Sequence, residues 1–239
     1  MTKDVKFLIE TVKQASKLVT DKFDVSRKAD SIGSFVTEID IAVEKFLVEK
    51  IKKAYPDFEI ISEELNSEVE VTDNCFIIDP IDGTTNFSNK IPLWVIQVAM
   101  RKNGKIVAAV LYAPKLHELY YADENGAFLN DEKIFVHNNK IDVTLFSGNM
   151  KNAPLTDTKL LKYTRHTRHF RSTGIDFAWV AAGRLGGAYY KYDSIWDYIA
   201  GQYLVEKAGG VIHNEPNFHA VANNEETMEI LKREVNGSE

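Results

Sequence analysis

The chain has 239 residues, of which 44% are hydrophobic, 27% charged and 11% aromatic, a composition typical of a globular protein with a substantial core. Fibrous and disordered classes are excluded. The formal net charge of −6, from 29 basic and 35 acidic residues, argues against a broad basic surface, so nucleic acid is not an expected partner.

The single cysteine, Cys75, excludes an intramolecular disulfide and is interpreted as a small core residue. The N-terminal MTKDVKFLIETVKQ has no apolar core of the kind found in signal peptides. No stretch approaches the roughly 18 consecutive apolar residues of a membrane span. We therefore expect a cytoplasmic protein that does not bind membranes.

Two helices and then several strands are predicted in the first half of the chain. Apolar residues recur at three- and four-residue steps over residues 5–19 and 37–54, which predicts two amphipathic helices. Later short runs are rich in β-branched and aromatic residues, which favour strands. These runs are EIIS (59–62), CFIID (75–79), LWVIQVAM (93–100), KIVAAVLYA (105–113) and ELYYA (118–122).

The second half mixes helices and strands. Strands are predicted at 143–148 and 186–192, and helices near 155–163, at 174–183, from about Asp197 to Gly209-Gly210, and over the terminal EETMEILKRE. Such mixed order indicates a layered α/β (α+β) fold. Because no low-complexity linker divides the chain, we expect two subdomains that share a core, residues 1–135 and 136–239.

The strongest chemical signal is DPIDGTTNF at residues 79–87, directly after the apolar run 76–78. Asp79 and Asp82 would leave a buried strand three residues apart, and carboxylates there need solvent, hydrogen-bond partners or cations. Hard divalent cations such as Mg²⁺ suit such oxygen ligands. The alternative is a plain surface turn, because Asp, Pro, Gly and Asn all form turns.

Three residues of this motif and two further acidic motifs add to the signal. Gly83 allows a close turn, and Thr84 and Thr85 offer N–H groups and hydroxyls for phosphate oxygens. SEE at 62–64 and WDYIAG at 196–201 place more carboxylates after a strand and at a helix start. Taken singly, SEE is more typical of exposed glutamates in a charged loop, and WDYIAG is as typical of an acid that only stabilises a helix N-terminus.

Together the three motifs resemble those of the inositol monophosphatase family in type, order and approximate spacing. The likeness extends from the FVTEID segment at 35–40 to Gly209-Gly210. It implies an αβαβα sandwich, a homodimer, and Mg²⁺-dependent hydrolysis of a small phosphorylated metabolite such as an inositol monophosphate. It also makes inhibition by lithium an expectation.

The resemblance further implies roles for individual residues. The metal ligands, expected to hold two or three Mg²⁺ ions, are Glu63, Asp79, the carbonyl of Ile81, Asp82 and Asp197. Asp40 and Thr84 would position and deprotonate the attacking water, with Glu63 beside them, and Gly83, Thr84 and Thr85 would bind the phosphate. Thr37 and Asp40 also have the spacing of a helix capping box, and both roles are compatible.

One departure from the family pattern concerns the substrate. Lys191 stands near a position where inositol-specific relatives have an acidic residue, so it is a candidate contact for a second phosphate. The alternatives are therefore phosphatases for 3'-phosphoadenosine 5'-phosphate, fructose 1,6-bisphosphate or histidinol phosphate. A regulatory binding role in RNA metabolism is a second alternative. The basic segment at 162–171 is interpreted as a solvated face or a modest basic patch.

Overall fold

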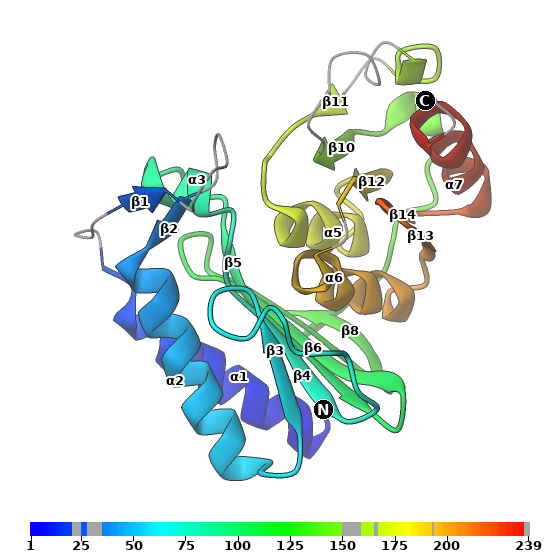
Figure 1. Cartoon of the computed structure of the whole chain (residues 1–239). Coiled ribbons are helices and arrows are strands. Elements are labelled where there is room, and N and C mark those ends of the chain that lie inside the picture. Colours follow the sequence, from blue (N-terminus) through cyan, green and yellow to red (C-terminus); the bar gives the residue numbers. More distant parts are fainter. Residues whose placement is uncertain (21–24, 28–34, 150–158, 165–166, 193, 237–239) are drawn as a thin grey trace.

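The computed structural model describes residues 1–20, 25–27, 35–149, 159–164, 167–192 and 194–236. Its elements stack in five layers, which Figure 1 shows from one edge. Helices α1 and α2 cover one face of a seven-stranded sheet, α5 and α6 lie between that sheet and a five-stranded sheet, and α7 covers the far face. This is the αβαβα sandwich expected from the sequence.

The seven-stranded sheet has the order β3-β4-β5-β6-β7-β8-β9, with β3 and β4 parallel and every other pair antiparallel. Its strands are β3 (Glu59–Ser62), β4 (Cys75–Asp82), β5 (Val95–Lys102), β6 (Lys105–Ala113), β7 (Glu118–Asp123), β8 (Gly126–Leu129) and β9 (Glu132–Ile134). Every residue of β4 is buried, because helices cover both faces of the sheet there.

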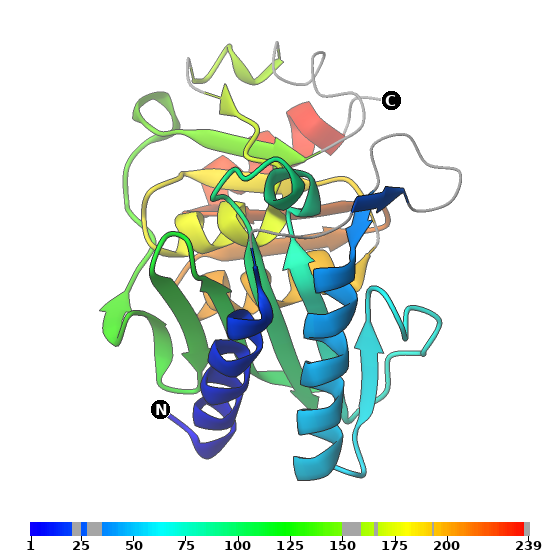
Figure 2. The ribbon, with the colours of Figure 1, turned by 90° about the vertical axis from the view of Figure 1, so that its left-hand side faces the viewer.

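The outer helices are α1 (Lys3–Ala15), followed by a 3-10 turn at Ser16–Leu18, and α2 (Glu38–Ala54). They lie side by side against the sheet in Figure 2. Each buries its predicted apolar stripe, and Thr2 and Thr37 cap their N-termini. Strands β1 (Val25–Arg27) and β2 (Phe35–Thr37) pair antiparallel just before α2.

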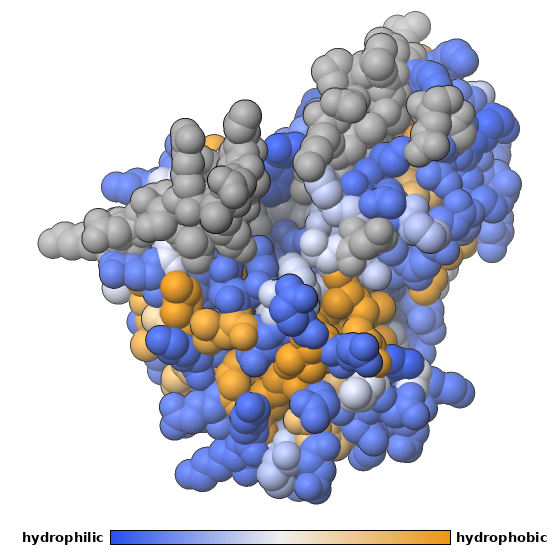
Figure 3. Space-filling view, viewed as in Figure 1, coloured by the Kyte–Doolittle hydropathy of each residue, from blue (hydrophilic) through white to orange (hydrophobic). Residues whose placement is uncertain are grey.

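The five-stranded sheet has the order β11-β10-β12-β14-β13. Its strands are β10 (Phe146–Asn149), β11 (Thr167–Arg168), β12 (Gly187–Tyr190), β13 (Val211–Glu215) and β14 (Phe218–Ala222). The helices around it are α5 (Thr173–Ala181), α6 (Ile195–Lys207) and α7 (Glu225–Leu231), with a π-helical turn at Lys232–Asn236. On the face shown in Figure 3, hydrophobic side chains gather near the centre, where the seven-stranded sheet meets α6.

Most predicted elements are confirmed, with small differences at their ends. The strand predicted at 143–148 begins only at Phe146, because a 3-10 turn at Ile141–Val143 precedes it. The predictions did not include β8, β9, β13 and β14, which are short and flanked by turns, or the short pair β1 and β2, which lies between α1 and α2. DPIDGTTNF contains a short helix, α3 (Thr84–Ser88), rather than only a turn. Most of the helix predicted near 155–163 lies outside the described residues.

Candidate active site

The two acids of DPIDGTTNF reach the same face of the sheet because β4 is irregular between them. Side chains alternate along a strand, so residues three apart would normally face opposite sides. The register between β4 and β5 shifts between Asp79 and Asp82, as at a β-bulge. Ile81 therefore packs in the core under α1 and α2, while Asp82 contacts α5 on the other side. The surface-turn alternative is wrong, since both acids are buried.

Asp82 is held by the N-terminus of α5. Its carboxylate accepts hydrogen bonds from Ser172 Oγ (2.6 Å), the amide of Thr173 (3.2 Å) and the amide of Gly174 (2.7 Å). These donors are the N-cap and first amides of the helix, which favour a negative charge. Burial raises the pKa of Asp82 to about 6, although these hydrogen bonds lower it.

Asp197 enters the site from the first turn of α6 and has two partners from other elements. The phenol of Tyr190, in β12, donates a short hydrogen bond to Asp197 Oδ2. Gln97 Nε2, in β5, donates to the main-chain carbonyl of Asp197 at 3.1 Å. Both sheets thus contribute to the position of this carboxylate.

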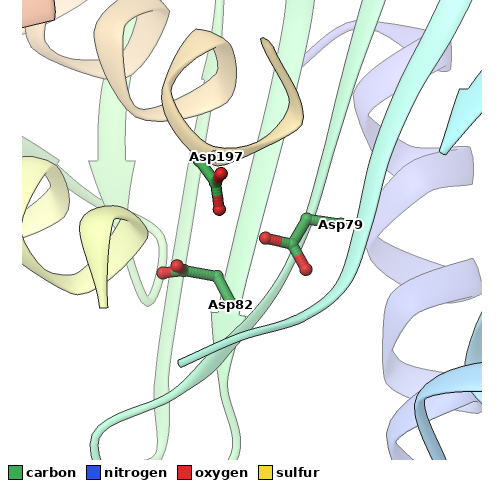
Figure 4. Close-up of side chains that lie close together, drawn as sticks. All are labelled: Asp79, Asp82 and Asp197. Carbon is green, nitrogen blue, oxygen red and sulfur yellow. The ribbon is translucent and has the colours of Figure 1, made fainter. Parts of the chain in front are cut away.

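Asp79, Asp82 and Asp197 converge, as Figure 4 shows, in the space between β4 and α6. Each offers a carboxylate oxygen, and these atoms lie within 4.8 Å of one another. Burial and the charges of Glu63, Asp82 and Asp197 raise the pKa of Asp79 well above its ordinary value. Burial, followed by the charges of Glu63 and Asp82, does the same for Asp197. Such crowding of negative charge is costly unless a proton or a cation compensates it.

Glu63 lies beside this group, and a buried glutamate of α2 fixes its turn. The charge of Glu63 acts on Asp79, Asp82 and Asp197, although its carboxylate is not among the three that lie within 4.8 Å. Glu44 accepts hydrogen bonds from Ser62 Oγ (2.6 Å) and the amides of Glu64 and Leu65 (2.8 Å each). Glu44 thereby sets the path of the backbone on both sides of Glu63.

Asp40 both caps α2 and reaches Thr84. The capping box is present: the amide and hydroxyl of Thr37 donate to Asp40 Oδ2, and the Thr37 hydroxyl accepts from the amides of Ile39 and Asp40. The other carboxylate oxygen, Oδ1, lies 3.3 Å from Thr84 Oγ1. Burial raises the pKa of Asp40. The two roles expected for Asp40 are therefore geometrically compatible.

Gly83 begins α3 in a conformation that glycine adopts at low cost. Its φ is 93°, and a Cβ at this position would lie 2.9 Å from the carbonyl oxygen of Leu93 and 3.1 Å from Ser172 Cβ. Thr84 Oγ1 lies 3.0 Å from the carbonyl of Ile81, and Thr85 is exposed. The first amides of the short helix lack helical partners, as at any helix N-terminus.

Comparisons with known proteins bear on what this arrangement does. The model of the inositol monophosphatase family matches residues 1–217. The chain belongs to the inositol monophosphatase family. It is 36% identical to an inositol-1-monophosphatase of Rhizobium meliloti over 190 residues, covering 74% of this chain and 71% of that protein. It is 33% identical to the Nus factor SuhB of Escherichia coli over 227 residues, covering 88% and 85%.

A solved structure agrees with this assignment. An IMPase from Thermotoga maritima superposes with a TM-score of 0.87 at 30% identity, covering 97% of this chain and 96% of that one. Members of the inositol monophosphatase family are phosphatases, so the protein is a phosphoric monoester hydrolase.

The donor set of this inositol monophosphatase family member fits a hard divalent cation. All three converging groups are carboxylates, and Asp79 and Asp82 are buried without a cationic side chain among the hydrogen bonds and ion pairs of the described residues. Oxygen ligands of this kind suit Mg²⁺ better than soft metals. The site could therefore hold metal, in keeping with a metal-dependent family.

Lys191 does not lie with the acids of the family motifs. Its ammonium donates to the carbonyl of Val235 at 3.4 Å, in the π-helical turn after α7. Side chains alternate along β12, so Tyr190 faces Asp197, while Tyr189 packs in the core beneath α7. Lys191 comes two positions after Tyr189, so it lies on the same side of the strand as Tyr189 and not on the side of Tyr190. Its role as a substrate contact stays a prediction.

Several residues that form hydrogen bonds with the acids, or with the backbone beside them, were not predicted from the sequence. They are Glu44, Gln97, Ser172, Gly174 and Tyr190. Only Glu44 left a signal, a charge next to the apolar stripe of a predicted helix. Gln97, Ser172 and Gly174 contact acids at least 18 positions away, and Tyr190 lies only seven positions before Asp197 but in another element. Cys75 is buried and free, as expected of a core residue.

Proposed function

We propose that this phosphatase hydrolyses a small phosphate monoester of the inositol monophosphate type with Mg²⁺ as cofactor. The observation that carries the proposal is the convergence of Asp79, Asp82 and Asp197 within 4.8 Å, beside Glu63, in a chain of this family. With the carbonyl of Ile81, these residues would hold two or three ions. Bound Mg²⁺ would neutralise phosphate charge and lower the pKa of a water molecule.

The remaining steps are assigned to side chains near the acids. Thr84 Oγ1, 3.3 Å from Asp40 Oδ1, would orient the attacking water, and Asp40 would accept its proton through Thr84. Burial raises the pKa of Asp40, and a carboxylate with a higher pKa is a stronger base. Gly83, Thr84 and Thr85 would hold the phosphate oxygens with the first amides of α3.

The substrate is best tested with a panel of esters. Purified protein with Mg²⁺ is assayed for phosphate release from inositol 1-phosphate, fructose 1,6-bisphosphate, 3'-phosphoadenosine 5'-phosphate and histidinol phosphate. We expect the highest kcat/KM for inositol 1-phosphate. A higher value for one of the other esters would contradict the proposed substrate and favour the corresponding sibling phosphatase.

The same panel tests Lys191. If its ammonium leaves Val235 to meet a second phosphate, Lys191→Met should lower kcat/KM for the two bisphosphorylated esters more than for inositol 1-phosphate. Equal changes for all esters would show that Lys191 contributes only its contact with Val235.

A regulatory binding role is a second candidate, because one relative carries the name Nus factor. It is separated from catalysis by Asp82→Asn, which removes a carboxylate from the site, once the circular dichroism spectrum and melting temperature of this variant show that it is folded. Full rescue of a deletion phenotype by this variant would favour binding, whereas no rescue would favour catalysis. No helix among the described residues is long and apolar enough to cross a membrane. A cytoplasmic location and a homodimer stay predictions.

A further inference from the structure

Gln97 is a buried amide at the centre of the acid site. It lies in β5 directly opposite Asp79 of β4, and its side chain is 1% exposed. Cross-strand neighbours of this kind place their side chains on the same face of the sheet. A glutamine is costly to bury unless its polar atoms find partners. The partners of Gln97 therefore indicate what its side chain does.

The amide nitrogen of Gln97 connects two carboxylate residues that come from different layers. Nε2 donates to the main-chain carbonyl of Asp197 at 3.1 Å and lies 3.4 Å from Asp79 Oδ2. A primary amide has two N–H groups, so both contacts can form at once. One side chain thus fixes Asp79, on the sheet, relative to the first turn of α6.

The amide oxygen of Gln97 lies beside Gly174, in the first turn of α5. A Cβ on Gly174 would come within 3.1 Å of Gln97 Oε1 and 3.0 Å of Asp82 Oδ2, so a glycine leaves room for both. Oε1 has no hydrogen-bond partner among the described residues. The reverse orientation of the amide would direct this oxygen at two acceptors, the Asp79 carboxylate and the main-chain carbonyl of Asp197, and both contacts would be repulsive.

We propose that Gln97 is a positioning residue that sets the spacing of Asp79 and Asp197 for a divalent cation. It touches no reacting atom; it acts through the two acids that its amide joins. Groups that orient metal ligands in this way typically change metal affinity when they are removed. The inference rests on the proposed Mg²⁺ site, but it does not depend on which ester is hydrolysed.

The test compares two buried glutamines. Gln97→Met keeps the length of the side chain and removes its amide. Gln202→Met is the matched control: Gln202 is also 1% exposed, its Nε2 donates to His213 O and Asn214 Oδ1, and its Oε1 likewise has no partner among the described residues. Mg²⁺ binding to metal-free protein is measured by calorimetry without substrate, together with the melting temperature.

We expect Gln97→Met to weaken Mg²⁺ binding by about 10-fold to 100-fold, and Gln202→Met to leave it within about 2-fold of the wild type. In the phosphate-release assay the Mg²⁺ concentration for half-maximal rate should rise by the same factor, whereas kcat at saturating Mg²⁺ should stay within about 3-fold. Gln97→Asn, which keeps the amide but is one methylene shorter, should weaken binding in the same direction if Gln97→Met does not fold.

Unchanged Mg²⁺ affinity in Gln97→Met or Gln97→Asn would overturn the proposal and leave a merely structural role. Equal weakening in Gln202→Met would overturn it as well, because the effect would then follow any buried amide. Hydrolysis of none of the tested esters by the wild type would contradict the proposed substrate, while calorimetry would still decide the role of Gln97.

Discussion

Ser172 Oγ donates a hydrogen bond of 2.6 Å to Asp82 Oδ2, although 90 positions separate the two residues in the chain. The same oxygen accepts from the amide of Ile175 and so caps α5. One hydroxyl therefore joins the DPIDGTTNF motif to the helix layer between the two sheets. The position of Asp82 depends on the start of α5 as much as on its own strand.

Removing this hydroxyl should affect both stability and metal binding. Ser172→Ala loses the N-cap of α5, which should lower the free energy of unfolding by about 1 kcal/mol. Asp82 also loses a donor, so Mg²⁺ affinity should fall by about 10-fold. Urea denaturation and Mg²⁺ titration measure the two effects. Normal Mg²⁺ affinity in a destabilised Ser172→Ala protein would show that the cap matters only for folding.

The crowded acids predict a trade-off between stability and activity. In metal-free protein at a pH above the raised pKa of Asp79, Asp79→Asn should raise the free energy of unfolding by about 1 to 2 kcal/mol, because it removes a buried charge that its neighbours repel. The same variant should lack activity. Mg²⁺ should raise the melting temperature of the wild type but not that of Asp79→Asn. A less stable metal-free Asp79→Asn protein would contradict this account.

The stability that Asp79→Asn gains over the wild type should decrease as the pH is lowered. An acid whose pKa is raised by folding stabilises the fold at low pH, and this contribution is lost as pH rises through the raised pKa. For Asp79 this loss occurs above the ordinary value of 3.8, because burial and the charges of Glu63, Asp82 and Asp197 raise its pKa. The stability advantage of the variant should therefore shrink as pH falls through the raised pKa of Asp79 toward 3.8. Denaturant unfolding of both proteins across this range tests the sign.

The turn that carries Glu63 should depend on a residue outside the motifs. Glu44→Gln places an N–H group opposite other donors, and it should lower the free energy of unfolding by about 2 kcal/mol. Because Glu44 holds the backbone on both sides of Glu63, the substitution should also displace Glu63 and so lower kcat/KM by about 10-fold. Glu49→Gln, on an exposed face of the same helix, is the control. Equal effects of both substitutions would exclude a specific role for Glu44.

Gly83 and Gly209 form a matched pair for testing the turn at the phosphate motif. Both have positive φ, 93° and 85°, but nothing lies within 4 Å of a Cβ built on Gly209. Gly209→Ala should therefore cost only the backbone strain, about 1 kcal/mol. Gly83→Ala should cost more and abolish activity, because its Cβ would lie 2.9 Å from the carbonyl of Leu93. Equal losses of stability would show that the contact relaxes freely.

Local patterns in the sequence were sufficient for the first two helices and for most strands of the larger sheet, whereas the acids were assigned through the resemblance of their motifs to a family. The apolar stripes of α1 and α2 and the β-rich runs of β3 to β7 have the predicted periods. The predicted acids Asp79, Asp82 and Asp197 converge because the last half of β4 carries the first two and the first turn of α6 carries the third.

The supporting residues could not be predicted in the same way. Ser172 lies 90 positions from Asp82 and Gln97 lies 100 positions from Asp197, and only the register of strands and the packing of layers bring them together. Tyr190 is only seven positions before Asp197, but it belongs to another element. The bulge that directs Asp82 to the side of Asp79 is likewise a tertiary feature.

The most direct test of the central claim is phosphate release from inositol 1-phosphate by chelator-treated protein as Mg²⁺ is added back, for the wild type and Asp82→Asn. Asp123→Asn, a buried acid outside the site, serves as control. We predict no release without Mg²⁺, saturable recovery in the wild type and in Asp123→Asn, and a loss of at least about 100-fold in Asp82→Asn. Full activity without a divalent cation, or in Asp82→Asn, would contradict the claim that these carboxylates form the catalytic metal site.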